Sequence, residues 1–153
     1  MKKVLEKLSK EFEKKKVPAQ LTEDGKALSL YLSKDVAGRE VYMDIWFRPY
    51  AEDKKEGGYW ILRSEVAEVS GLSPEEKSEL ANRIAVINPG LLAGGYGLFM
   101  EDEVEEEYLT YRISVPLNGK EAEEFMIDEL LNAASVSAEI IKDSAGIVLE
   151  EKK

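Results

Sequence analysis

The most regular feature of the chain is an alternation of apolar and polar side chains that predicts β-strands. Leucine occupies every second position over residues 28–32, and apolar residues again alternate with polar or aromatic ones over 41–48. A period of two places successive side chains on opposite faces of a sheet. These two runs, joined by a turn around 35–38, therefore predict an antiparallel hairpin. The same alternation predicts a third strand over 59–66, a fourth over 96–101 and a fifth over 108–115.

The first helix is predicted near the beginning of the chain. Apolar residues recur there at helical spacing, at Val4, Leu5, Leu8 and Phe12. Pro18 disfavours a helical conformation at the residue before it, so this helix should end near residue 16.

A second helix is predicted from its start and stop signals. Ser73 can act as the N-cap, Pro74 suits the first helical position, and Glu76 can return a hydrogen bond to the cap. The segment Asn88-Pro89-Gly90 should end the helix.

The third predicted helix is unusually long. It should start after Asn118, with Glu121 completing the cap, and end before Gly146. Twenty-six helical residues would span about 39 Å, so we expect either a break around Ser135–Ser137 or a contact with a partner at the helix end. The side chains expected to face inward are Ala122, Phe125, Met126, Leu130, Ala133 and Ile140.

The order of these elements predicts the fold class. Helix, three strands, helix, two strands and helix, with short strand connections, favour an α+β domain of two layers. Helices should cover one face of a five-stranded antiparallel sheet. We find no linker or repeat, so residues 1–153 are expected to form a single domain.

Several short segments resemble a known family. They are Trp60-Ile-Leu-Arg63 on the third strand, Ile87-Asn88 at the end of the second helix, Gly97-Leu-Phe99 with Glu101-Asp102, and Tyr111 to Leu117 before the last helix. In these segments the chain resembles the bacterial sensory-transduction-regulator family of YbjN type. The element order is similar to the secretion-chaperone-like fold, in which type III secretion chaperones are small acidic homodimers that hold a partner chain. The resemblance implies that fold, a tendency to dimerise and a regulatory or chaperone-like binding role, and it supplies no catalytic residue.

Composition argues against most catalytic machineries. The 153 residues include neither histidine nor cysteine, so the usual neutral-pH proton shuttle, the thiol nucleophile and the favoured zinc ligands are missing. We therefore expect no enzyme activity. The remaining enzyme alternative would use carboxylates such as Asp44 together with Arg63.

The charge of the chain restricts its partners and its location. The formal net charge is −10, and a deficit of clustered Lys and Arg disfavours nucleic acid as a partner. The longest uncharged stretch, 84–100, contains Asn88-Pro89-Gly90 and Gly94-Gly95, which suit a loop better than a membrane span. We expect no membrane segment and no secretory signal, and the absence of cysteine favours a cytoplasmic location.

Two segments that could hold a cofactor or a metal have simpler explanations. Six of the seven residues in 101–107 are acidic, but they lack the spacing of a calcium loop and suit a solvated hairpin tip. The Gly-rich connection 91–97 precedes a strand and lacks a phosphate-loop motif, so it predicts a flexible connection. We expect no cofactor and no metal.

The candidate site is the sheet face that no helix is expected to cover. If the apolar stripes face the helices, aromatic and arginine side chains point the other way, a combination typical of protein interfaces. The alternative is that these aromatics are half-buried pairs that stabilise the sheet. The sequence thus favours a protein-binding module, acting as a homodimer, over a small-ligand-binding regulatory domain. The residues predicted to bind the partner are Tyr42, Trp46, Tyr59, Ile61 and Arg63, accompanied on the same face by Tyr31, Asp44, Arg48 and Arg112.

Overall fold

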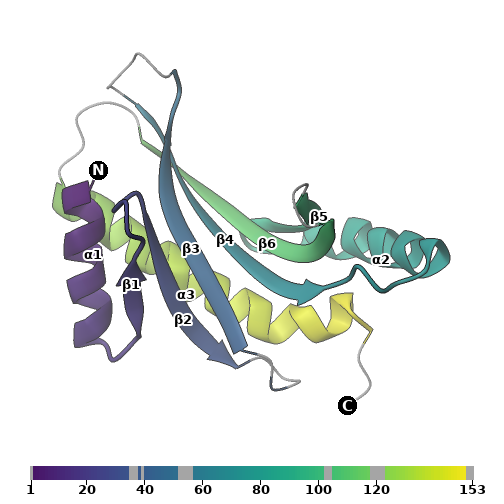
Figure 1. Ribbon diagram of the computed structural model, residues 1–153. Coiled ribbons are helices and arrows are strands. Elements are labelled where there is room, and N and C mark those ends of the chain that lie inside the picture. Colours follow the sequence, from purple (N-terminus) through teal and green to yellow (C-terminus); the bar gives the residue numbers. More distant parts are fainter. Residues whose placement is uncertain are drawn as a thin grey trace.

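The computed structural model is an α+β fold built around one antiparallel sheet (Figure 1). It describes residues 2–34, 38, 40–51, 57–101, 105–117 and 123–150, apart from the side chains of Ser33, Glu101, Glu123 and Glu124. The six strands are ordered β1-β2-β3-β4-β6-β5. Their bounds are β1 Ala19–Leu21, β2 Ala27–Lys34, β3 Glu40–Pro49, β4 Gly58–Glu68, β5 Gly95–Glu101 and β6 Glu106–Leu117.

The sheet has one more strand than the five predicted. The additional strand, β1, has only three residues and pairs with β2, with Ala19 opposite Leu30. Three residues are too few for an alternating pattern to be recognised in a sequence, which explains the error. The predicted antiparallel pairing of all the other strands is confirmed.

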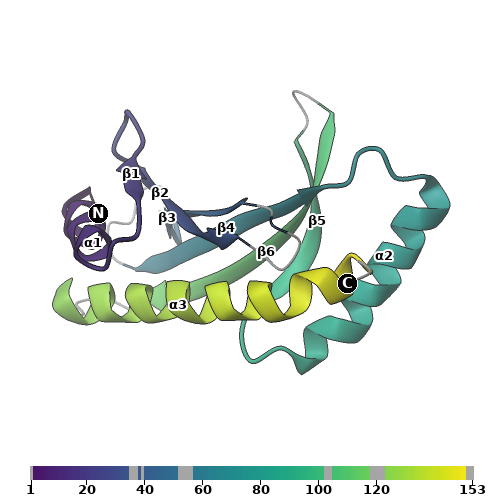
Figure 2. The same cartoon turned by 90° about the horizontal axis from the view of Figure 1, so that it is seen from below.

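Three α-helices are described: α1 (Lys2–Lys14), α2 (Pro74–Ile87) and α3 (Glu123–Val148). Figure 2 shows α3 running along one side of the sheet, with α1 near β1 and α2 near β5 at opposite ends. Apolar residues of α1 pack with the first half of α3 in one core cluster. Those of α2 pack with the second half of α3 in another. The helices therefore bury one face of the sheet, which we call the covered face.

The start of α2 forms as the sequence predicts. The Ser73 hydroxyl accepts a hydrogen bond from the Glu76 N–H at 3.1 Å, and the Glu76 carboxylate accepts one from the Ser73 N–H at 3.2 Å. The backbone N–H groups of Ser73 and Glu76, which no carbonyl of the helix can reach, are thus both hydrogen-bonded.

The end of α2 is tied to the sheet by a side-chain amide. A short 3-10 helix, η1 (Asn88–Gly90), follows α2 directly. Asn88 Oδ1 accepts a hydrogen bond from the Tyr96 N–H at 2.8 Å, while its Nδ2 donates to the Tyr96 carbonyl at 2.9 Å. The predicted stop signal therefore also fixes the position of β5 relative to α2.

The long helix α3 differs from the prediction in three respects. It is continuous through Ser135–Ser137, because Ser137 is buried and its hydroxyl donates to the Ala133 carbonyl at 2.7 Å without interrupting the helix. It continues past Gly146 to Val148, whose full burial outweighs the low helix propensity of glycine. Phe125, predicted to face inward, is 51% exposed. Asn118, Glu121 and Ala122, on which the predicted start depended, lie outside the described residues.

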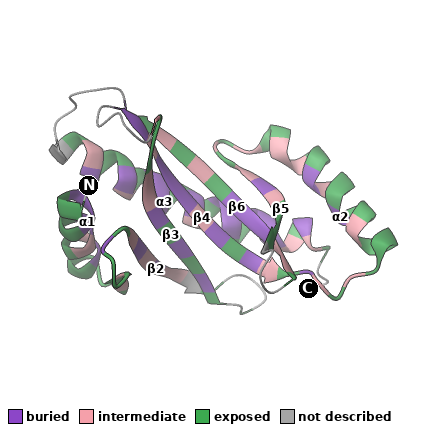
Figure 3. Cartoon of the chain, turned by 45° about the horizontal axis from the view of Figure 1, so that its top comes forward, coloured by how far each residue is buried: buried purple, intermediate pink, exposed green. Residues whose placement is uncertain are grey.

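The predicted division of the strands into two faces is confirmed. Along β3, buried and exposed residues alternate over 40–45 (Figure 3). The covered face includes Leu28, Leu30, Met43, Ile45, Trp60 and Leu62, all within the first core cluster. The alternate positions point to the other face of the sheet, where the candidate site lies.

Candidate functional site

The face of the sheet opposite α3 has no helix on it among the described elements (Figure 2). We call it the open face. Its side chains come from five neighbouring strands, β2 to β6, and the strand registers place them in rows across the sheet. The residues that concern us are Tyr31, Tyr42, Asp44, Trp46, Arg48, Tyr59, Ile61, Arg63, Phe99, Arg112 and Ser114.

The centre of the open face is a contact between one arginine and two aromatic rings. The guanidinium carbon of Arg63 lies 5.3 Å from the centre of the Trp46 ring and 4.6 Å from that of Phe99. Both distances are within the range of a cation–π interaction. Because Trp46 is on β3 and Phe99 on β5, Arg63 on β4 connects side chains from across the sheet.

Two pairs of tyrosines flank this centre. Tyr31 and Tyr42 meet edge to face at 5.4 Å between ring centres, and Tyr50 meets Tyr59 at 5.6 Å. Tyr42 is half exposed and its hydroxyl donates to Glu40 at 3.1 Å. That hydrogen bond to a carboxylate raises the pKa of Tyr42. Such ring pairs fit the alternative that these aromatics stabilise the sheet, yet part of each ring stays accessible to a partner.

Ile61 occupies a different position from the other predicted site residues. Its strand position puts it on the open face, but it is only 1% exposed. It is directly opposite Trp46 on β3 and Ser114 on β6. Ile61 therefore forms the floor beneath the aromatic side chains and is not available for direct contact with a partner.

Asp44 and Arg63, the pair named for the enzyme alternative, are opposite each other in register but form no ion pair among the described residues. Asp44 is exposed, whereas the guanidinium of Arg63 contacts the two rings. General acid–base catalysis relies on carboxyl groups in a cleft that excludes water. Asp44 lies on the exposed surface of the open face.

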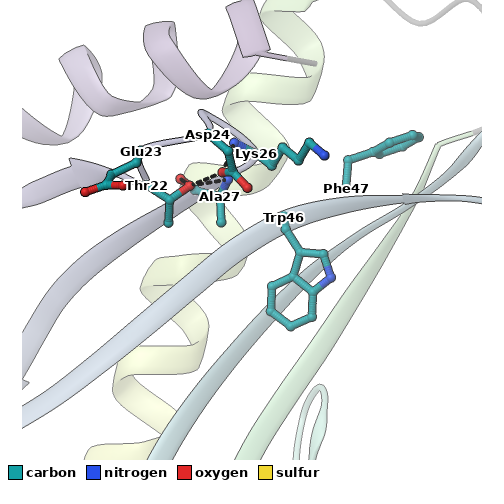
Figure 4. Close-up of a pocket in the computed structure, with 7 residues that line it drawn as sticks. All are labelled: Thr22, Glu23, Asp24, Lys26, Ala27, Trp46 and Phe47. Atoms are coloured by element: carbon teal, nitrogen blue, oxygen red, sulfur yellow. Dashed lines mark hydrogen bonds between the residues drawn. The ribbon is translucent and has the colours of Figure 1, made fainter.

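Two shallow hollows border the open face. One, of about 560 Å³, lies between Trp46 and the turn that joins β1 to β2 (Figure 4). In that turn Asp24 accepts hydrogen bonds from the Lys26 N–H at 3.0 Å and the Thr22 hydroxyl at 2.7 Å, and these lower the pKa of Asp24. The other hollow, of about 470 Å³, lies over β5 and β6 and is lined by Gly95, Tyr96, Gly97, Thr110, Arg112 and Ser114.

Sequence reasoning did not assign Phe99, Gly95 or Gly97 to this face. The strand predicted over 96–101 includes Gly97 and Phe99 without giving them a face, and Gly95 was placed in the Gly-rich connection, whereas it lies within β5. The alternation starting at Tyr96 places Gly95, Gly97 and Phe99 on the open face, so the signal was present. It was weak because glycine has no side chain to show which face it occupies.

The described residues contain no group of three or more acidic side chains arranged to hold a metal ion. None of the helices that the structure describes combines the length and apolar character of a transmembrane span.

Comparisons with known proteins identify the fold. No family model matches the chain, and no curated protein matches it significantly. Among solved structures, YbjN from E. coli, a proposed transcription regulator, matches with a TM-score of 0.54. The two are 14% identical, and the match covers 93% of this chain and 91% of YbjN. The predicted likeness to YbjN is therefore confirmed at the level of the fold.

Proposed function

We propose that this chain is a non-catalytic protein-binding module, of a regulatory or chaperone-like kind, that engages its partner through the open face. The observation that carries this proposal is the cluster of Arg63 with Trp46 and Phe99 on a sheet face that none of the described helices covers. Aromatic residues and arginine are enriched at protein interfaces, where a few of them supply most of the binding energy. The YbjN-like fold agrees with a regulatory role, since YbjN is itself a proposed transcription regulator.

The test compares Trp46→Ala with a control variant on an element away from the open face. Val136, in the middle of α3, is 36% exposed, so Val136→Ala serves as the control. Proteins captured from the native host by the wild-type chain should be retained by Val136→Ala and lost with Trp46→Ala. With the captured partner purified, Trp46→Ala should weaken binding by more than about 1 kcal/mol. A partner that binds both variants equally would contradict a role for the open face.

We also propose that the chain works as a homodimer. Support comes from apolar side chains exposed on α2, on β5 and on the connection between them: Val86 is 78% exposed, Leu92 94% and Met100 55%. Burying such side chains is favourable, so they suit a surface between two subunits. Sedimentation equilibrium at micromolar concentration should give twice the chain mass of 17.2 kDa. A mass of 17.2 kDa at every concentration would exclude the dimer and leave the binding proposal for the open face untouched.

A further inference from the structure

The open face contains two arginines whose N–H groups find no acceptor among the residues that the structure describes. Arg63 on β4 and Arg112 on β6 are directly opposite each other in the strand register. Neither forms a hydrogen bond or an ion pair with another described residue, and the Arg63 guanidinium lies against the two aromatic rings. Like charges directly opposite each other on a sheet are destabilising. An anion bound between the two guanidinium groups would relieve this repulsion.

The structure holds one of the two cations in place and leaves room beside the other. Arg63 is fixed by Trp46 and Phe99, so binding an anion would cost it little side-chain entropy. On the far side of Arg112, the row ends at Gly95 of β5. With Gly97, this residue opens the 470 Å³ hollow that Arg112, Thr110 and Ser114 line. A Cβ atom at Gly97 would meet nothing within 4 Å, so this space is accessible from the open face.

The surrounding charges restrict which anion can bind. Asp44 flanks Arg63 on β3, and Glu65 lies two residues along β4. The whole chain carries a formal charge of −10. A polyanion such as a nucleic acid would be repelled by this charge. A single carboxylate flanked by apolar side chains avoids that repulsion and would place the apolar groups against Trp46 and Phe99.

We propose that Arg63 and Arg112 form a carboxylate-binding site that takes one acidic side chain of an extended partner segment, with apolar residues on either side of it. The inference rests on the proposed function, because it assigns the chemistry of a partner bound at the same face. Planar guanidinium groups bind carboxylates through paired, charge-assisted hydrogen bonds. The site therefore recognises a short pattern, apolar-acidic-apolar, in a chain that is neutral or basic overall.

The experiment uses two blocked peptides, Lys-Val-Phe-Glu-Val-Thr-Lys and the same peptide with Gln in place of Glu. Each is titrated into the full chain labelled with ¹⁵N, and the arginine Nε and tryptophan indole resonances are followed. We expect the Glu peptide to shift the Arg63, Arg112 and Trp46 signals saturably. The Gln peptide should bind about tenfold more weakly, because it loses the charge-assisted bonds.

Three variants locate the site. Arg112→Gln should weaken the Glu peptide about tenfold and leave the Gln peptide unchanged, bringing the two affinities together. Gly97→Val should weaken the Glu peptide by filling the hollow, and the open space at this position predicts that it folds normally. Lys142→Gln, at an exposed position on α3 on the other side of the sheet, is the matched control and should change neither affinity. Arg112→Gln should also be at least as stable as the wild type, since it removes a repulsion.

Two outcomes would overturn the proposal. If both peptides bind equally and Trp46→Ala weakens them alike, the open face binds protein segments but the carboxylate site does not exist. If inorganic phosphate displaces the Glu peptide at lower concentration than acetate does, the site is a phosphate site and the carboxylate assignment is wrong. The first result leaves the proposed function standing. That function would be refuted separately if the wild-type chain captured no protein from the native host.

Discussion

The two faces of the sheet each carry a tryptophan, and the difference between them shows how one sheet can serve both stability and binding. Trp60 on the covered face is 1% exposed and packs against Phe47 with ring centres 5.3 Å apart. Trp46, on the neighbouring strand, is half-buried on the open face and contacts a cation. The covered face excludes water through helices from distant parts of the sequence. In the described part of the chain, the aromatic side chains of the open face are supported by neighbouring strands of the sheet and not by a helix.

The largest expected difference between the faces concerns these two tryptophans. Trp60→Ala should destabilise the fold by about 4 kcal/mol, because it leaves a large cavity beneath the helices. Trp46→Ala should cost about 1 kcal/mol, since its ring is partly solvated already. Urea unfolding followed by circular dichroism measures both. Equal losses would mean that the open face is a second core covered by something the described residues do not include.

A smaller effect, due to buried tyrosines of the covered face, should appear in the free energy of unfolding at alkaline pH. Burial raises the pKa of Tyr96 to about 12, partly offset by its hydrogen bond with the Ser144 hydroxyl, and burial also raises the pKa of Tyr111. In the unfolded chain tyrosine ionises near pH 10. Between pH 10 and about 12 the unfolded state therefore releases protons that the folded state retains, so stability falls as the pH rises. The loss due to Tyr96 should reach about 2 kcal/mol at pH 12.

Urea unfolding at a series of pH values from 8 to 11.5 tests this expectation. Tyr96→Phe provides the comparison, because the variant has the same ring without an ionisable hydroxyl. Its stability should decline less steeply above pH 10 than that of the wild type. Identical slopes would show that Tyr96 is not protected from ionisation in the folded state.

The smallest predicted effect has the opposite sign. Within the described part of the chain, Trp60 Nε1 and Ser64 Oγ are buried without a hydrogen-bond partner, and both lie on the covered face. Ser64→Ala removes one such group and should stabilise the fold by up to about 1 kcal/mol. Ser114→Ala on the open face should change stability by less than about 0.5 kcal/mol, because its hydroxyl is exposed. Thermal melts of the two variants side by side measure the difference, and destabilisation by Ser64→Ala would indicate an unseen partner for that hydroxyl.

The sequence predicted the fold best where its signals were local and periodic. The alternation over 41–48 and the cap at Ser73 were sufficient to place β3, both sheet faces and the start of α2. The three residues of β1 gave no such signal, and the course of α3 past Gly146 depends on tertiary burial of Val148. Local propensity does not report burial of that kind.

For the candidate site, the sequence predicted which residues share the open face better than how they contact one another. Period-two reasoning grouped Trp46 and Arg63 on one face, and the structure brings them into contact. It did not reveal that Ile61 lies beneath its neighbours or that Phe99 completes the cluster from β5. Strand order decides which residues meet across a sheet, and here β6 lies between β4 and β5, which local patterns do not specify.

The side-chain amide of Asn88 occupies part of the outer edge of β5, the last strand of the sheet. By bonding both the N–H and the C=O of Tyr96, one side chain imitates the peptide group of a seventh strand. Backbone groups two residues apart along a strand point the same way, so those of Leu98 and Met100 continue this outer edge. The backbone N–H and C=O of Tyr96 are already hydrogen-bonded, so a strand from another molecule could pair only with the short remainder of β5. An uncovered strand edge with apolar residues can pair edge to edge with sheets of other molecules and so promote aggregation. Asn88, which also ends α2, restricts that pairing here.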